Sequence, residues 1–139
     1  MLSGSDKAFF EKAAKSGEKE VAVSQAVLPN LKNPQVRAFA QSMISDHTAA
    51  NTELKSLAMS KGVTLPSMDQ KLSAKWSENT KDTDEDYIEE MVSDHKEAVE
   101  LFEKASKSQD TEIAAFASSK LPKLQHHLES AKALEKTVD

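Results

Sequence analysis

Histidine and aspartate side chains recur in this sequence at spacings that could hold a metal ion. Two similar pentapeptides, MISDH and MVSDH, end at His47 and His95, and a third histidine, His127, lies near the C-terminus. Imidazole nitrogens bind zinc, copper, nickel and iron, and carboxylates serve as further ligands or as hydrogen-bond partners of the rings. Asp46 and Asp94 precede the first two histidines, so they are candidate ligands beside the three imidazoles.

The elements that carry these residues are predicted to be long α-helices in one domain that spans residues 1–139. The chain contains only three glycines and four prolines, and alanine, lysine, glutamate and leucine, which are strong helix formers, are frequent. Apolar periodicity and capping residues predict helices over about 5–28, 34–61, 83–106 and 111–136, with a crossover over about 62–82. Two helical hairpins joined by so long a connection predict an all-α, ferritin-like four-helix bundle, with a simple up-down-up-down bundle as the second choice.

Local signals define where these helices begin and end. Ser5 or Asp6 is the expected N-cap of the first helix, and Asn33, followed by a proline, is expected to cap the second. Gly62 is a natural stop at the C-terminal end of that helix. The crossover is expected to contain a short helix over about 68–77 and to leave the second and third helices parallel.

The helical periodicity predicts which way the histidines point. His47 and His95 fill gaps in the apolar stripes of the second and third helices, so both are expected to face the interior. His127 lies at the edge of the stripe in the fourth helix, whereas His126 is rotated by about 100° and is expected to be more exposed. Glu20 borders the stripe of the first helix. The members of that stripe are Phe10, Ala13, Gly17, Val21 and Ser24.

Charge and hydropathy exclude several classes of partner. The net charge is −5 with both signs interspersed, and without a basic stripe the chain is not expected to bind nucleic acid. No apolar run approaches the roughly 18 residues that a membrane-spanning helix needs. The opening MLSGSDKAFF is not a signal peptide as written, and it is typical of a mature exported chain with an added methionine. The residues expected to be most buried are Phe10, Phe39, Leu54, Phe102, Phe116 and Leu124.

Each helix is predicted to point one metal-competent side chain toward the interior, namely Glu20, His47, His95 and His127. Counting residues from the first loop, however, separates Glu20 from His47 by about six residues in depth, or roughly 9 Å. The di-iron pattern of bundle proteins needs Glu-x-x-His on two helices, and apolar residues occupy the position three before each histidine. A di-iron oxidase is therefore disfavoured.

The same residues also have a purely structural interpretation. A buried imidazole can hydrogen-bond across the bundle to an aspartate or a backbone carbonyl, which fixes helix register without any chemistry. Asp46 and Asp94 can likewise be partners of lysines or histidines. If the histidines bind a metal instead, the neutral imidazole is the ligating form, and metal affinity is expected to fall as the pH drops through about 6.5.

Four stretches of the chain resemble the bacterial domain-of-unknown-function family DUF4142, whose members often carry an outer-membrane label. They are FFEKAAKSGEKEV, NPQVRAFAQSMISDHTAANTELKSLAMSKGVTLP, YIEEMVSDHKEAVELFEKAS and FASSKLPKLQHHLESAKAL. The resemblance implies a ferritin-like four-helix bundle that is exported to the periplasm or cell surface. It also implies that the recurrent histidines of the family correspond to His47, His95 and His127. It supplies no established activity, because a fold alone does not define a function.

The sequence therefore favours a non-enzymatic, exported helical bundle that binds a transition metal through His47, His95 and His127. The first alternative is a structural or protein-interaction module, linked to stress, in which these histidines only pack the core. The second is a ferritin-like oxidoreductase, against which the missing Glu-x-x-His motifs argue. No protein partner can be named from the sequence.

Overall fold

A computed structural model of the chain describes residues 2–65 and 70–138. Within these ranges the protein is all helical and contains no strand, which confirms the predicted fold class. None of the described helices combines the length and the apolarity that a membrane span requires. The four long helices are α1 (Gly4–Val27), α2 (Pro34–Ser60), α3 (Thr83–Ala105) and α4 (Thr111–Val138), and the two short 3₁₀ helices are η1 (Leu28–Asn30) and η2 (Gln70–Ser77).

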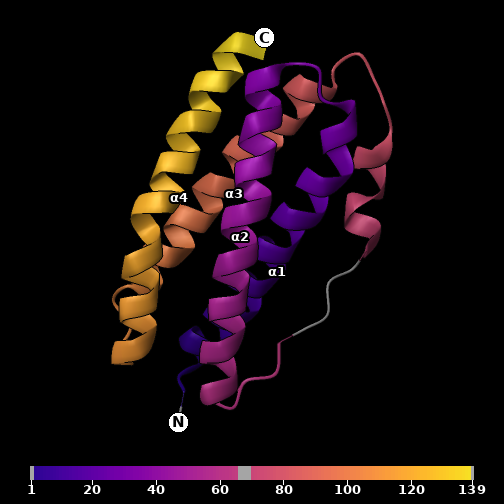
Figure 1. Cartoon of the computed structure of the whole chain (residues 1–139). Helices are drawn as coiled ribbons and strands as arrows, with labels where there is room; N and C mark the ends of the chain where they lie inside the picture. The colour runs from indigo at the N-terminus through magenta and orange to yellow at the C-terminus, as the bar shows by residue number, and fades with distance from the viewer. Residues whose placement is uncertain (1, 66–69, 139) are drawn as a thin grey trace.

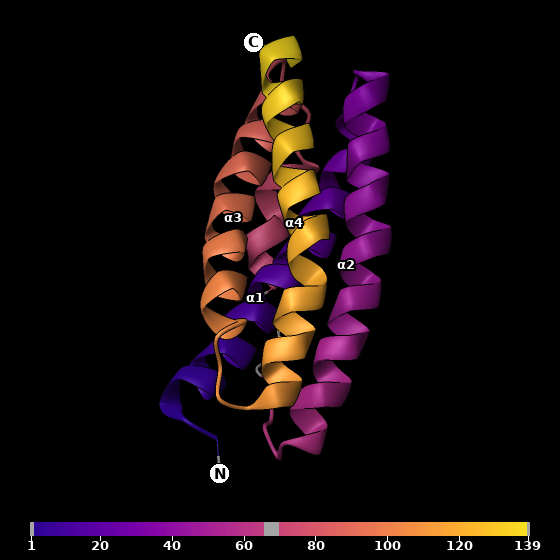
Figure 2. The same cartoon turned by 90° about the vertical axis from the view of Figure 1, so that its left-hand side faces the viewer.

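The four helices form two antiparallel hairpins, α1 with α2 and α3 with α4 (Figures 1 and 2). The chain leaves α2 at one end of the bundle and enters α3 at the opposite end, so α2 and α3 run in the same direction (Figure 1). This confirms the long crossover of a ferritin-like bundle. On the way η2 packs along α1. The predicted short helix was to begin at Met68, which lies outside the described residues, whereas its C-terminal end at Ser77 agrees with η2.

The first helix begins earlier than predicted. Its N-cap is Ser3, not Ser5 or Asp6, and the Ser3 hydroxyl accepts a hydrogen bond of 3.0 Å from the backbone N–H of Asp6. Asp6 is instead an acid in the first turn, where the positive end of the helix dipole favours it. Its carboxylate also accepts a 2.8 Å hydrogen bond from Ser108, which ties the start of α1 to the α3–α4 connection.

The ends of α2 follow the predicted signals. Asn33 caps the helix, and its side-chain oxygen accepts hydrogen bonds from the backbone N–H groups of Gln35 and Val36. Gly62 follows the C-terminal end with a φ of 75°, in the left-handed region that glycine adopts at little cost. The backbone N–H of Val63 reaches back to the carbonyl of Ala58 at 2.9 Å, which completes a Schellman-type cap.

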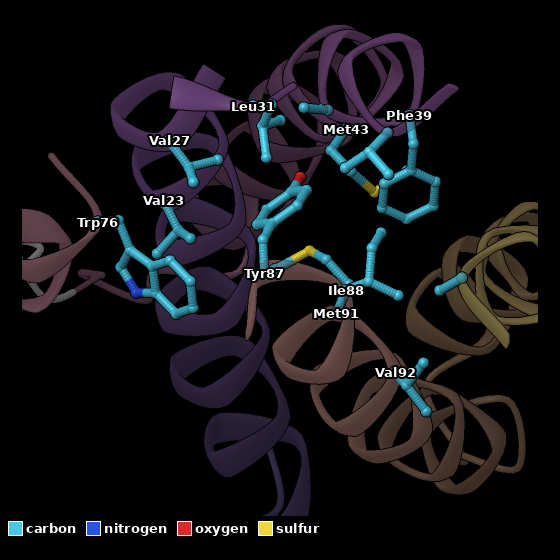
Figure 3. Packing of buried hydrophobic residues seen from close by; sticks show 13 residues of the cluster. Val23, Val27, Leu31, Phe39, Met43, Trp76, Tyr87, Ile88, Met91 and Val92 are labelled. Atoms are coloured by element: carbon cyan, nitrogen blue, oxygen red, sulfur yellow. The ribbon is translucent and has the colours of Figure 1, made fainter. Parts of the chain in front are cut away.

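Buried apolar side chains gather at both ends of the bundle and leave a polar layer between them. Where α3 begins, they surround Tyr87 (Figure 3), and its hydroxyl lies 2.6 Å from that of Ser24. Trp76 of η2 covers this cluster, with its ring 6.3 Å from that of Tyr87. Where α1 begins, Phe9 and Phe10 centre the second cluster. His47, His95 and His127 lie on their helices between the two clusters.

Phe102 and Phe116 are only half-buried, which corrects the prediction that they are among the most buried residues. Both rings pack against Phe9, at centroid distances of 5.1 and 6.4 Å. They also border a cavity beside the middle of the bundle, and this leaves part of each ring uncovered. The remaining predicted core residues are buried, namely Phe10, Phe39, Leu54 and Leu124.

The first helix buries a wider face than the predicted stripe. Val21 is only half-buried, whereas Glu20 and Val23 are buried. The reason is that α1 contacts α2, α3 and η2, so that more than one line of residues is covered. Gly17 allows α1 to approach α2 closely, because a Cβ at this position would collide with the side chain of Asn51.

Candidate metal centre

The imidazole rings of His47, His95 and His127 meet in the middle of the bundle, from α2, α3 and α4 respectively. Their ring centroids form a nearly equilateral triangle with sides of 5.5, 5.5 and 5.6 Å. One ring nitrogen from each histidine lies within 4.8 Å of the other two. Among the described residues, the group that meets here consists of imidazoles alone. All three side chains are buried, with 8, 1 and 5% of their residue surface exposed.

Hydrogen bonds on the outer sides of two rings define which nitrogen carries the proton. His95 Nδ1 lies 2.7 Å from the carbonyl oxygen of Met91, and a carbonyl can only accept, so Nδ1–H donates and Nε2 keeps its lone pair. His127 Nε2 lies 2.9 Å from Asp46 Oδ2, and the carboxylate accepts in the same way, which leaves the lone pair on Nδ1. Partners of this kind orient metal-binding histidines in proteins.

One buried nitrogen of each ring has no hydrogen-bond partner: Nε2 of His47, Nε2 of His95 and Nδ1 of His127. For His95 and His127 these are the nitrogens that carry the lone pair. A buried polar atom without a partner costs about 1–3 kcal/mol of stability. Three such atoms in one place are unfavourable in a merely structural core, and imidazole nitrogens are donors that transition metals bind.

Burial keeps the three rings neutral. It lowers the pKa of His47 to about 3, assisted by the neighbouring His95 and His127. Burial also lowers the pKa of His95 to about 4, against the opposing effect of the Met91 carbonyl. The pKa of His127 is lowered by burial too, which outweighs the hydrogen bond to Asp46. The low pKa values of His47 and His95 move the expected loss of metal affinity to a pH below 6.5.

Asp46 belongs to the surroundings of the three histidines rather than to the group itself. Its carboxylate accepts the hydrogen bond from His127 and lies 3.6 Å from the Lys123 ammonium. Partial burial alone would raise the pKa of Asp46, but the hydrogen bond with His127 and the charge of Lys123 hold it below its usual range. The aspartate is therefore ionised near neutral pH and places a negative charge directly behind one imidazole.

Glu20 and Asp94 form a separate carboxyl pair. Glu20 is 2% exposed, and burial raises its pKa well above the usual range, with further contributions from the charge of Asp94 and a hydrogen bond to it. Asp94 also forms an ion pair with Lys19, with 3.3 Å between Oδ2 and Nζ, and Lys19 reaches Glu90 at 2.8 Å. Burial and the neighbouring Asp94 therefore favour the protonated form of Glu20.

The position of Glu20 along the bundle axis differs from the one predicted by counting residues from the first loop. Gly17 faces Asn51 across the antiparallel α1–α2 pair, so three residues further along α1 Glu20 lies level with Thr48, one residue from His47. The predicted offset of six residues was wrong because η1 extends α1 by a further turn before the chain reverses. Even so, the group of metal-competent side chains whose ligand atoms lie within 4.8 Å of one another does not include Glu20.

Sequence reasoning named Asp46 and Asp94 as partners of histidines or lysines, but it did not identify Lys19 or the Met91 carbonyl. Lys19 was not singled out, because a lysine on an amphipathic helix ordinarily faces solvent. The Met91 carbonyl carries no signal in the sequence beyond its position one turn before His95. The prediction that His126 points away from the core is confirmed, since it is exposed.

The comparisons with known proteins agree with this architecture. The model of the family DUF4142, a domain of unknown function, matches residues 1–134. No protein with a curated description matches the chain. In three dimensions the chain is similar to the crystal structure of a DUF305 fragment from Deinococcus radiodurans, with a TM-score of 0.83, 8% sequence identity and coverage of 97% of each chain. At this identity the likeness establishes the fold alone.

Proposed function

The chain belongs to the DUF4142 family, and we propose that it binds one transition-metal ion through His47, His95 and His127. The observation that carries the proposal is the set of three buried ring nitrogens that lack hydrogen-bond partners. In a tetrahedral zinc site with bonds of about 2.0–2.1 Å, ligand nitrogens lie about 3.3 Å apart. Nitrogens within 4.8 Å of one another therefore need to close by no more than about 1.5 Å, which small rotations of the side chains provide.

The charges around the rings suit a divalent cation. Neutral imidazoles contribute no charge, so a buried ion needs compensation from nearby anions. Asp46 supplies one negative charge through His127, and Asp94 lies next to His95 in the chain. Three nitrogen donors favour zinc, copper, nickel or iron over calcium and magnesium, which prefer oxygen.

A binding titration with tag-free, metal-free protein tests the proposal. Zinc, copper, nickel and, without oxygen, iron(II) are added in turn, and one of them is expected to bind at one ion per chain. At a free concentration of 100 times the Kd, binding adds about 2.7 kcal/mol of stability, or a rise in Tm of about 8–10 °C. The double variant His47→Gln/His95→Gln removes two donors and should abolish both effects, whereas His126→Gln, at an exposed histidine, should retain them.

The second candidate function is a structural or protein-interaction module. Its support is that the hydrogen bonds from His127 to Asp46 and from His95 to Met91 would fix helix register even without an ion. If none of the four metals moves the melting curve at pH 7.5, this alternative replaces metal binding.

The proposed location is the periplasm or the cell exterior. Its support is the export that the resemblance to the DUF4142 family implies. Fractionation of cells that express the gene at its natural locus tests it, and recovery of the protein with a cytoplasmic marker enzyme would contradict it.

A further inference from the structure

A cavity of about 50 Å³ lies against two of the three histidines, His47 and His127. His47 and His127 line its inner end. Gly17 of α1 and Asn51 of α2 line it as well. Lys120 and Lys123 of α4 lie toward solvent. The cavity therefore joins the surface of the bundle to the place where two of the three imidazoles meet.

The walls of this cavity are mostly apolar. Phe102 and Phe116, whose ring centroids are 6.2 Å apart, line it together with Leu54 and Leu124. Ala50 lines it as well, and this small side chain helps to leave the space open. The cavity thus explains why these two phenylalanines are only half-buried.

Two lysines border the mouth of the cavity. Of the charged residues that line it, Lys120 and Lys123 are cations and Asp46 is an anion already engaged with His127. Lys120 pairs with Glu53 outside the cavity, and its ammonium lies 5.6 Å from the centroid of the Phe116 ring. Lys123 lies 3.6 Å from Asp46. With a divalent cation at the inner end, the cavity favours an anion.

We propose that a metal held by the three histidines presents its remaining coordination position to this cavity, and that a short-chain monocarboxylate binds there with its hydrocarbon chain against Leu54, Phe102 and Phe116. The inference rests on the proposed metal binding. Three protein ligands leave a tetrahedral ion one position for an exogenous ligand, and the group of described residues offers no fourth protein donor. The volume of about 50 Å³ equals that of about three to five water-sized probes, which suits a chain of about three or four carbons.

Glu20 does not compete for that position. Its carboxyl group does not belong to the metal-competent group formed by the three histidines, and it does not line the cavity. The cavity is bordered instead by apolar side chains and two lysines. The lysines favour an anion, and the apolar side chains favour a carboxylate with a hydrocarbon chain over a bare inorganic anion.

Cobalt(II) makes the test visible, because its absorption in the visible range changes with its ligands. Metal-free protein is first titrated with cobalt(II), and failure to form a coloured complex would overturn this inference, whereas the titrations with zinc, copper, nickel and iron(II) decide the metal binding itself. The cobalt protein is then titrated with acetate and with butyrate. Butyrate should shift the spectrum and bind about 15-fold more tightly than acetate, because each buried methylene contributes about fourfold. A cobalt spectrum that responds to neither, or to both with equal affinity, would overturn the carboxylate site alone.

Two neighbouring alanines of α2 supply the matched control. Ala50 lines the cavity, whereas Ala49 is exposed on the other side of the helix. Ala50→Leu should fill the cavity and remove the preference for butyrate, while Ala49→Leu should keep it, with cobalt binding intact in both. Should Ala50→Leu not fold, Phe116→Ala enlarges the same cavity and should shift the preference toward hexanoate. An unchanged preference in the folded variant contradicts the proposal.

Discussion

Asp46 Oδ2 and His127 Nε2 lie 2.9 Å apart although 81 positions separate the two residues in the chain. The contact joins α2 to α4, and it directs the free Nδ1 of His127 toward His47 and His95. A carboxylate behind a metal-binding imidazole fixes its tautomer and increases its basicity. The pair is therefore a positioning device for the proposed metal centre as well as a link between two helices.

Replacing Asp46 by asparagine should weaken metal binding by about 10-fold to 100-fold. The asparagine oxygen can still accept the hydrogen bond from His127, but the negative charge is lost. The measurement is the Kd of whichever metal binds the wild-type protein, determined by calorimetry. Glu53→Gln is the control, since it removes a carboxylate from the same helix that contacts Lys120 rather than a histidine. Equal affinities for Asp46→Asn and the wild type would show that the carboxylate plays no part.

The sequence predicted the bundle well because its signals are local. Asn33 and Gly62 define the ends of α2 through hydrogen bonds and a backbone angle that depend only on nearby residues. The apolar spacing around His47 and His95 likewise indicates which face of a helix is buried. These signals were sufficient to predict that both histidines face the core, and both are buried.

The depth of Glu20 could not be predicted in the same way, because it depends on how helices slide along one another. The offset between α1 and α2 is set by the geometry of η1 and by the close contact of Gly17 with Asn51. Neither follows from periodicity. The same holds for the half-buried Phe102 and Phe116, whose exposure results from a cavity between helices that no single helical stripe reveals.

The buried aromatic residues should dominate the stability of the fold. Phe10 is fully buried, so Phe10→Ala should lower the free energy of unfolding by about 3–5 kcal/mol. Met59→Ala is the control, because it also truncates a large side chain. Met59 is 78% exposed, so this change should lower the free energy of unfolding only slightly. Urea denaturation followed by circular dichroism measures both. A loss below about 0.5 kcal/mol for Phe10→Ala would contradict the placement of this ring in the core.

Protonation of the histidines should destabilise the metal-free protein in acid. The folded-state pKa values of His47 and His95 are about 3 and about 4, whereas unfolded histidine titrates near 6.5. Between these values the unfolded state binds more protons, so stability is complete above about pH 6.5 and decreases as the pH falls. At pH 5 each of these histidines costs about 2 kcal/mol.

A comparison with His47→Gln/His95→Gln isolates this effect from other titrating groups. With a chelator present, the stability of the wild type relative to the double variant should decrease by about 4 kcal/mol between pH 7.5 and pH 5.0. Denaturant unfolding at the two pH values gives the difference. If the relative stability is the same at both, the histidines are not held as buried neutral rings.

Glu20 should produce the opposite dependence on pH. Burial raises its pKa well above the usual range, and Asp94 raises it further. Between the unfolded and folded pKa values the folded state binds the extra proton, so stability is complete below the unfolded pKa and decreases as the pH rises through this interval. Glu20→Gln mimics the protonated carboxyl group, since its amide can still donate a hydrogen bond to Asp94.

The Glu20→Gln variant should therefore be more stable than the wild type at pH 8, and this advantage should shrink toward pH 4. Within the interval between the two pKa values the difference should change by about 1.4 kcal/mol per pH unit. Denaturant unfolding of both proteins at pH 8, 6 and 4, again with a chelator, measures it. Glu11→Gln is the matched control, because it makes the same chemical change at an exposed position of α1 and should give no such trend. An advantage that does not vary with pH would mean that Glu20 does not enter the core as a neutral acid, and that Lys19 and its neighbours compensate an ionised carboxylate instead.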